Sequence, residues 1–166
     1  MKKFLSILFL FFIIFHEMIG QQTVGEWRSY LAYGTTQKVV EANNLVFAIA
    51  DGSLYSYDKN DKSINVYSRE TGLSDNELNS IAFNSDNNTL LIVYTNGNID
   101  LLGEKGIYNI PYLKNATTLQ FEKVNDIVFD KSYAYLSTNF GIVVIDMDKR
   151  EIHDTYRLNR SVYSLC

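Results

Sequence analysis

The feature that most constrains the fold is a hairpin pattern that recurs three times along the chain. A short turn with glycine separates two apolar runs at Asp51-Gly52, at Asn96-Gly97 and at Phe140-Gly141. The three glycines lie 45 and 44 residues apart. Asp-Gly and Asn-Gly supply the positive φ angles that tight hairpins need. Self-similarity at such a period indicates a repeat architecture.

Each repeat contains four short apolar runs, which are rich in β-branched and aromatic residues and too short for typical helices. In the first repeat these runs lie at 38–41, 45–50, 54–58 and 64–67. Equivalent runs follow in the other two repeats, at 80–83, 90–94, 99–102, 106–110, 126–129, 133–137, 142–146 and 151–156. We therefore expect four antiparallel strands in each unit of about 44 residues.

Four-stranded units at this spacing predict an all-β fold, a β-propeller of four-stranded antiparallel blades. One twisted sheet leaves two apolar faces uncovered, and stacking around an axis covers each face with the next blade. The predicted blades span about 36–74, 75–121 and 122–160, and the first strand of a fourth begins at 161. Because propellers have about four to eight blades, we expect 21–166 to be the N-terminal part of an incomplete propeller. The alternative is that two such chains pair to complete a ring.

The first twenty residues have the composition of a secretory signal peptide. Two lysines precede an apolar run at 4–15, which is broken only by Ser6, and a short polar end closes with Gly20. This run is shorter than the roughly 20 residues that a membrane-spanning helix needs. We predict export through the Sec pathway and cleavage between Gly20 and Gln21. A further strand candidate at 26–31 is placed to close the ring.

Charge and cysteine content argue against several classes of function. The net charge is −4, and Lys149-Arg150 is the longest basic run beyond the N-terminus. A nucleic-acid partner needs clustered lysine and arginine, so we expect none. Cys166 is the only cysteine, so the chain cannot form an internal disulfide.

Signals for catalysis and metal binding are weak. His153 and Asp154 offer the one hydrolytic pair outside the predicted signal peptide, but neighbouring residues on a strand point to opposite faces. Carboxylates at 58–61 and 146–148 share turns that could hold calcium, yet the EF-hand spacing is missing and turn chemistry explains them. We therefore expect no catalytic residue, no cofactor and no metal site.

Tyrosines are unusually frequent, at 12 in the chain. We expect most of them to fill the space between blades, and the alternative is a sugar-binding platform. Eight lie in or beside predicted strands: Tyr55, Tyr57, Tyr67, Tyr94, Tyr108, Tyr112, Tyr133 and Tyr135.

The connection at 69–83 resembles the signature of two-component-regulator propeller repeats. It contains Gly72-Leu73-Ser74 and then Ser80-Ile81, followed by a turn, a strand and the Asn96-Gly97 hairpin. The tryptophan-glycine-threonine strand usual in those repeats is replaced here by 91–95.

The order of features more closely resembles the PorZ family of type IX secretion accessories. The matching stretches are the signal peptide, Trp27-Arg28, and the segments 54–58, 72–75 and 94–100, and the resemblance covers about 24–166. It implies a non-enzymatic scaffold in the periplasm or at the outer-membrane cell surface of Gram-negative bacteria. The implied function is delivery of anionic lipopolysaccharide and anchoring of cargo, with other secretion-system or cell-surface proteins as partners. Lipopolysaccharide contacts are implied for regions C-terminal to this chain, so no ligand-binding residue is transferred.

Two other functions stay open. The first is the periplasmic glycan-sensing propeller of a hybrid two-component regulator. The second is a propeller-fold enzyme, which would bring histidine, arginine and acidic residues together at the central channel.

Overall fold

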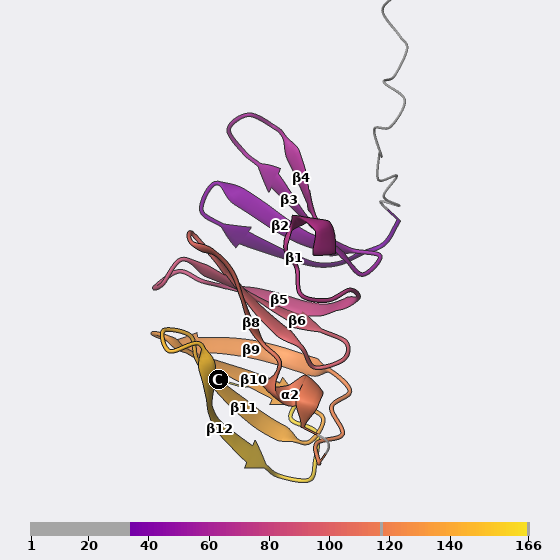
Figure 1. Ribbon diagram of the computed structural model, residues 1–166, viewed down its shortest axis with the longest axis vertical. Coiled ribbons are helices and arrows are strands. Elements are labelled where there is room, and N and C mark those ends of the chain that lie inside the picture. Colours follow the sequence, from indigo (N-terminus) through magenta and orange to yellow (C-terminus); the bar gives the residue numbers. More distant parts are fainter. Residues whose placement is uncertain (1–33, 117, 166) are drawn as a thin grey trace, which may run out of the picture. The chain divides into compact units, whose positions relative to one another are not determined.

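The computed structural model describes residues 34–116 and 118–165. The predicted signal peptide with its Gly20–Gln21 cleavage site, the strand candidate at 26–31 and Cys166 lie outside the described residues. In the described part, the chain forms three four-stranded sheets (Figure 1). No helix in these residues is long and apolar enough to cross a membrane.

Every strand pairs antiparallel with its neighbour in the sequence, so each sheet is a simple meander. The first sheet contains β1 (Thr36–Ala42), β2 (Leu45–Ala50), β3 (Ser53–Asp58) and β4 (Ile64–Tyr67). The second contains β5 (Leu78–Asn84), β6 (Thr89–Tyr94), β7 (Ile99–Gly103) and β8 (Gly106–Ile110). The third contains β9 (Val124–Asp130), β10 (Tyr133–Thr138), β11 (Gly141–Asp146) and β12 (Glu151–Arg157). Two short helical turns, η1 (Arg69–Thr71) and α2 (Tyr112–Asn115), lie in the connections.

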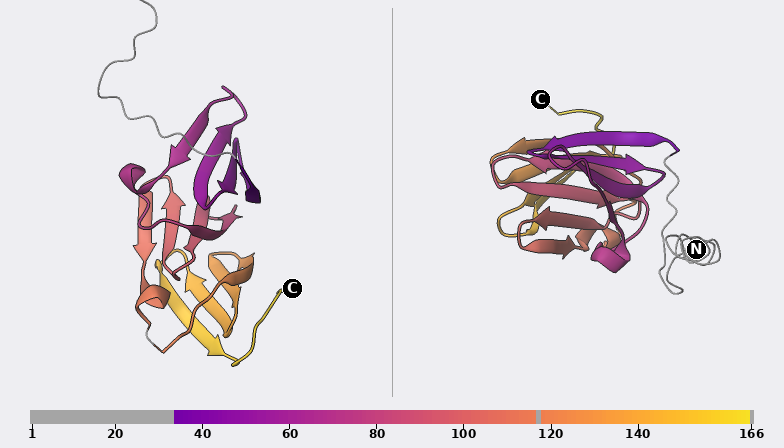
Figure 2. Two further views of the ribbon diagram at one scale, coloured as in Figure 1. Left: turned by 90° about the vertical axis from the view of Figure 1, so that its right-hand side faces the viewer. Right: turned by 90° about the horizontal axis from the view of Figure 1, so that it is seen from above.

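The three sheets follow one another in chain order (Figures 1 and 2). The first strand of each sheet contacts the first strand of the next, β1 with β5 and β5 with β9, which places these strands on the side of the propeller axis. The fourth strands, β4, β8 and β12, form the opposite edges. Over the described residues the sheets do not close into a ring. The predicted all-β fold of antiparallel four-stranded blades, incomplete as a propeller, is confirmed.

The apolar core lies between adjacent sheets. One cluster joins the first two sheets through residues such as Ile49, Leu54 and Ile92. A second cluster joins the second and third sheets through residues such as Leu91 and Leu136. β6 is buried along almost its whole length because its alternating side chains enter both clusters. Burial on both faces explains why its sequence is a continuous apolar run.

Both residues of the first hairpin turn have the positive φ angles that its sequence predicts, whereas in the second turn only Gly97 does, at 82°. Asp51 and Gly52 have φ angles of 47° and 74°. Gly141 has a φ of 152°, and a Cβ at this position would overlap the carbonyl oxygen of Tyr156. A larger residue at 141 would therefore force β11 and β12 apart.

Each first strand carries a register shift near its beginning, at Thr36/Lys38 in β1 and at Leu78/Ser80 in β5. The extra residue of β5, Asn79, accepts a hydrogen bond of 2.8 Å from the backbone N–H of Val124, at the start of β9. The bulge in β5 turns the Asn79 side chain out of the second sheet toward the third, which links these two blades near the axis.

The segment expected to begin a fourth blade runs beside β9 and forms no regular strand. The Val162 N–H donates to the carbonyl of Thr138 at 2.9 Å. The Ser164 hydroxyl lies 3.2 Å from the carboxylate of Asp126. A comparable bond runs from the Leu78 N–H to the carbonyl of Gly52, between the second sheet and the first. A strand needs a paired neighbour, and the described residues contain no second strand for this unit.

Candidate functional site

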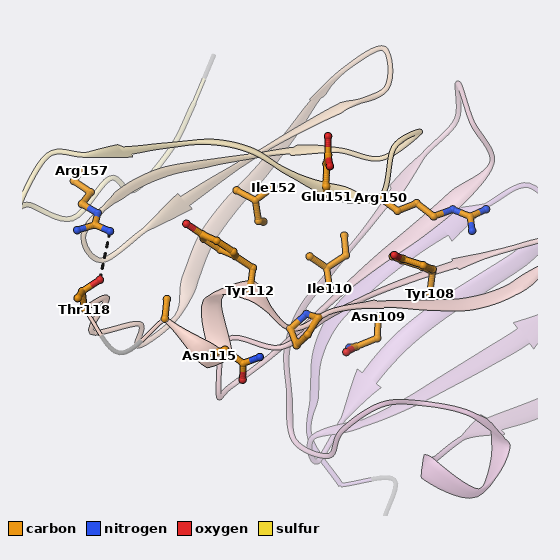
Figure 3. Close-up of a pocket in the computed structure, with 12 residues that line it drawn as sticks. Tyr108, Asn109, Ile110, Tyr112, Asn115, Thr118, Arg150, Glu151, Ile152 and Arg157 are labelled. Carbon is orange, nitrogen blue, oxygen red and sulfur yellow. Dashed lines mark hydrogen bonds between the residues drawn. The ribbon is translucent and has the colours of Figure 1, made fainter.

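A groove lies between the outer strands of the second and third sheets (Figure 3). β8 and α2 supply one wall, β12 and the turn before it supply the other, and the volume is about 680 Å³. Blades diverge with distance from the axis, so the outermost strands leave a wedge that the core side chains do not fill.

Two arginines lie at opposite ends of this groove (Figure 3). The guanidinium of Arg150 lies over the ring of Tyr108, 5.1 Å from its centroid, in a cation–π contact. The guanidinium of Arg157 is 3.4 Å from the hydroxyl of Thr118. Arg150 has a φ of 61°, in the left-handed region, because it ends the tight turn before β12.

The middle of the groove is apolar. Ile110 from β8, Ile152 from β12 and Tyr112 from α2 lie between the two arginines (Figure 3). Tyr108 and Tyr112 are 44% and 49% exposed. Among the described lining residues there is no histidine or cysteine, and Glu151 is the one carboxylate. This arrangement suits binding of a partly apolar, anionic ligand.

Residues of the signature stretches form a hydrogen-bond network around the buried Asp100, next to the β6–β7 hairpin and separate from the groove. Asp100, with no exposed surface, accepts hydrogen bonds from the Tyr94 hydroxyl at 2.6 Å and from the Ser74 N–H at 2.8 Å. The side chain of Asn109 donates to the other Asp100 oxygen at 2.8 Å. Burial is the main cause that raises the pKa of Tyr94 well above its usual range, and the hydrogen bond from the Tyr94 hydroxyl to Asp100 raises it further. The network fastens the connection at 72–75 to the second sheet.

A second part of the network holds Asp75. Its carboxylate accepts bonds of 2.6 Å from both Lys114 in α2 and the side chain of Asn96 in the hairpin. The hydrogen bond from Lys114 is the main cause that lowers the pKa of Asp75 from 3.8 to about 2. Asp75 therefore ties three segments together, and the 72–75 and 94–100 stretches have a structural role.

The hypothesis of a catalytic pair at His153 and Asp154 receives no support from the geometry. The His153 ring packs edge-on against Tyr133, with 5.1 Å between centroids. Asp154 accepts a bond of 2.7 Å from the Thr155 N–H, and its hydrogen bond to Tyr156 raises the pKa of that phenol. Both residues are exposed on β12.

The carboxylates considered for calcium serve their turns. Asp58 accepts from the Asn60 N–H and Asp61 from the Ser63 N–H, both at 2.8 Å. Asp146 accepts from the Lys149 N–H at 3.0 Å and forms a 3.3 Å ion pair with the same lysine. Over residues 34–116 and 118–165, no three histidine, cysteine or acidic side chains are grouped as metal ligands.

Sequence reasoning did not identify the groove. It treated Arg150 only as part of a short basic run and Tyr108 and Tyr112 as members of the aromatic set, and it gave Arg157 no role. These residues share a position in the repeat, because they lie in or beside β8 and β12, the fourth strands of adjacent units. Of the eight tyrosines singled out, Tyr55 and Tyr94 are buried, and the other six are half-buried or exposed, so the expectation that most of them fill the space between blades holds only in part.

A family model described as the N-terminal β-propeller domain of PorZ, of the type IX secretion system, matches residues 46–166. Comparison with curated proteins gave no match. Among solved structures, PorZ of Porphyromonas gingivalis is 38% identical with a TM-score of 0.73. That match covers 76% of this chain and 17% of PorZ, so the chain spans about a sixth of that protein.

Two structures of the extracellular domain of BT4673 from B. thetaiotaomicron are also similar. They are described as a putative one-component and a putative hybrid two-component system, and they are 19% and 18% identical. Each has a TM-score of 0.64 and covers 82% of this chain and 19% of its own. At this identity they show a shared propeller fold. The PorZ model, in contrast, matches more than half of the chain, and the chain therefore belongs to the PorZ N-terminal β-propeller family.

Proposed function

We propose that this chain is the propeller module of a type IX secretion accessory, which acts by binding other proteins and catalyses no reaction. The observation that carries the proposal is the 38% identity to PorZ over 76% of the chain. PorZ is described as an essential bacterial surface component of the type IX secretion system.

The site geometry supports a binding role. The acidic residues of the signature stretches stabilise the fold, since Asp100 and Asp75 each accept several hydrogen bonds. The groove between β8 and β12 offers arginine, tyrosine and aliphatic side chains, a combination typical of protein interfaces.

We further propose where the protein is located and which cargo it serves. The N-terminal lysines and apolar run support export by the Sec pathway, with cleavage after Gly20. The protein then participates in delivery of anionic lipopolysaccharide and in cargo anchoring at the cell surface. Mass spectrometry of the mature N-terminus should find Gln21 as the first residue.

A deletion strain of the encoding organism tests the proposal. The expected result is that type IX cargo loses its lipopolysaccharide anchor and no longer accumulates at the surface, and that the wild-type gene restores both. Unchanged cargo anchoring would contradict the proposal. If the transcript profile for glycan utilisation changes while anchoring does not, the regulator alternative is correct.

A further inference from the structure

We propose that the groove between β8 and β12 binds an extended acidic peptide segment of a partner protein, with an apolar side chain between its carboxylates. The inference rests on the proposed role as a binding module and names the chemistry of the partner. It assigns Arg150 and Arg157 to the carboxylates and the apolar middle of the groove to the side chain between them.

The groove differs in charge from the chain as a whole. The chain as a whole is acidic, with a net charge of −4, yet this groove has a guanidinium at each end. Glu151 points away from Ile110 and Tyr112, while Ile152 points toward them (Figure 3). The neighbouring cation, Lys149, is already paired with Asp146. The described lining holds two arginines and one carboxylate, so the groove has a net charge of +1 (two minus one) on an anionic protein, which favours an anionic partner.

Both guanidiniums are available to a ligand. Neither Arg150 nor Arg157 has an acidic partner within 4.0 Å among the described residues, whereas Lys59, Lys114 and Lys149 do. A contact over the Tyr108 ring orients the Arg150 guanidinium and leaves its N–H groups free to donate. Planar guanidiniums held in this way bind carboxylates with two parallel hydrogen bonds.

The spacing of the two arginines suits an extended peptide. Arg157 is the last residue of β12 and Arg150 directly precedes its first, so the strand, at about 3.3 Å per residue, separates their backbones by roughly 20 Å. A peptide segment of about seven residues covers that length when extended. Because Ile110 and Ile152 lie between the arginines, the middle of such a segment meets an apolar floor.

The apolar side chains in the middle of the groove favour a peptide over an acidic polysaccharide. Sugar rings stack on flat aromatic faces, and here one face of Tyr108 is covered by Arg150. The central surface comes from Ile110, Ile152 and the ring of Tyr112, which together pack against aliphatic and aromatic side chains of a partner.

The experiment selects a phage-displayed library of random nonapeptides on the full-length protein, with counter-selection on the double variant Arg150→Ala/Arg157→Ala. We expect enriched peptides to carry Asp or Glu on both sides of an apolar residue. Their affinity, measured by fluorescence anisotropy, should fall about three- to tenfold with each single substitution. Arg160→Ala removes the same charge from an exposed residue outside the groove and should change affinity less than twofold.

Three outcomes of the peptide selection overturn the proposal: no enrichment on the wild type over the double variant, enriched peptides without carboxylates, or affinities that the double variant leaves unchanged. Arginine-dependent binding of a polygalacturonate decamer in the absence of peptide binding assigns the groove to a glycan and also overturns it. Unchanged denaturant midpoints confirm that the variants fold. The selection is done in vitro, so its failure is distinguishable from an unchanged cargo phenotype in the deletion strain, which would contradict the proposed function.

Discussion

Single residues explain why the signature stretches have the sequence they have. Asp100 is a carboxylate without exposed surface, and such a group is stable only when donors surround it. Tyr94, Ser74 and Asn109 supply those donors from three different segments. The motif therefore fixes the position of the second blade relative to the connection that precedes it.

The Tyr94 hydroxyl offers a direct test of this network. Tyr94→Phe removes one donor to a buried carboxylate and should lower the free energy of unfolding by about 1–3 kcal/mol. Denaturant unfolding measures the change. Tyr112→Phe removes a hydroxyl from a half-exposed ring and is the matched control, with an expected change below about 0.5 kcal/mol. Equal effects of the two substitutions would show that the bond to Asp100 is unimportant.

Asp75 should make stability depend on acid. Its pKa is about 2 in the folded chain and 3.8 ordinarily, so the folded state favours the ionised form. This contribution is present above about pH 3.8 and is lost as the pH falls toward 2. Because Lys114 is partly exposed and its charge is screened, we expect about 1 kcal/mol. The stability difference between the wild type and Asp75→Asn should therefore be larger at pH 6 than at pH 2, and a constant difference would contradict the assignment.

At the scale of elements, sequence patterns predicted the strands well because their signals are local. The Asp51-Gly52 and Asn96-Gly97 turns, with apolar runs on both sides, fix each hairpin within a few residues. The bulge at Asn79 was not predictable, since its bond to Val124 joins residues 45 positions apart. The groove was missed for the same reason, because β8 and β12 approach each other only after the blades stack.

Burial of β6 on both faces gives a prediction for this element. Leu91 faces the third sheet and Ile92 faces the first, and both have no exposed surface. Leu91→Ala and Ile92→Ala should each lower the free energy of unfolding by about 2–5 kcal/mol. Lys105→Ala, in the exposed turn between β7 and β8 of the same sheet, should cost less than about 0.5 kcal/mol. A small effect at either position of β6 would mean that one face of the second blade is not packed.

At the scale of the whole molecule, the repeat determines how the sheets can associate. The second sheet is covered on both faces. The first sheet keeps Val39 and Ile64 exposed, and the third sheet keeps Tyr156 exposed. In a propeller these are the positions that an adjoining blade covers. The sequence predicted this arrangement from its period alone, because a four-stranded unit of about 44 residues has few other ways to bury two faces.

A crystal structure of the full-length protein would show how the three sheets are arranged. We expect β1, β5 and β9 to lie side by side around one axis, with β4, β8 and β12 directed outward and the Tyr94–Asp100 bond in place. If the three sheets instead packed as a sandwich or a closed barrel, with β1 separated from β5, the propeller architecture and the groove between β8 and β12 would both be wrong.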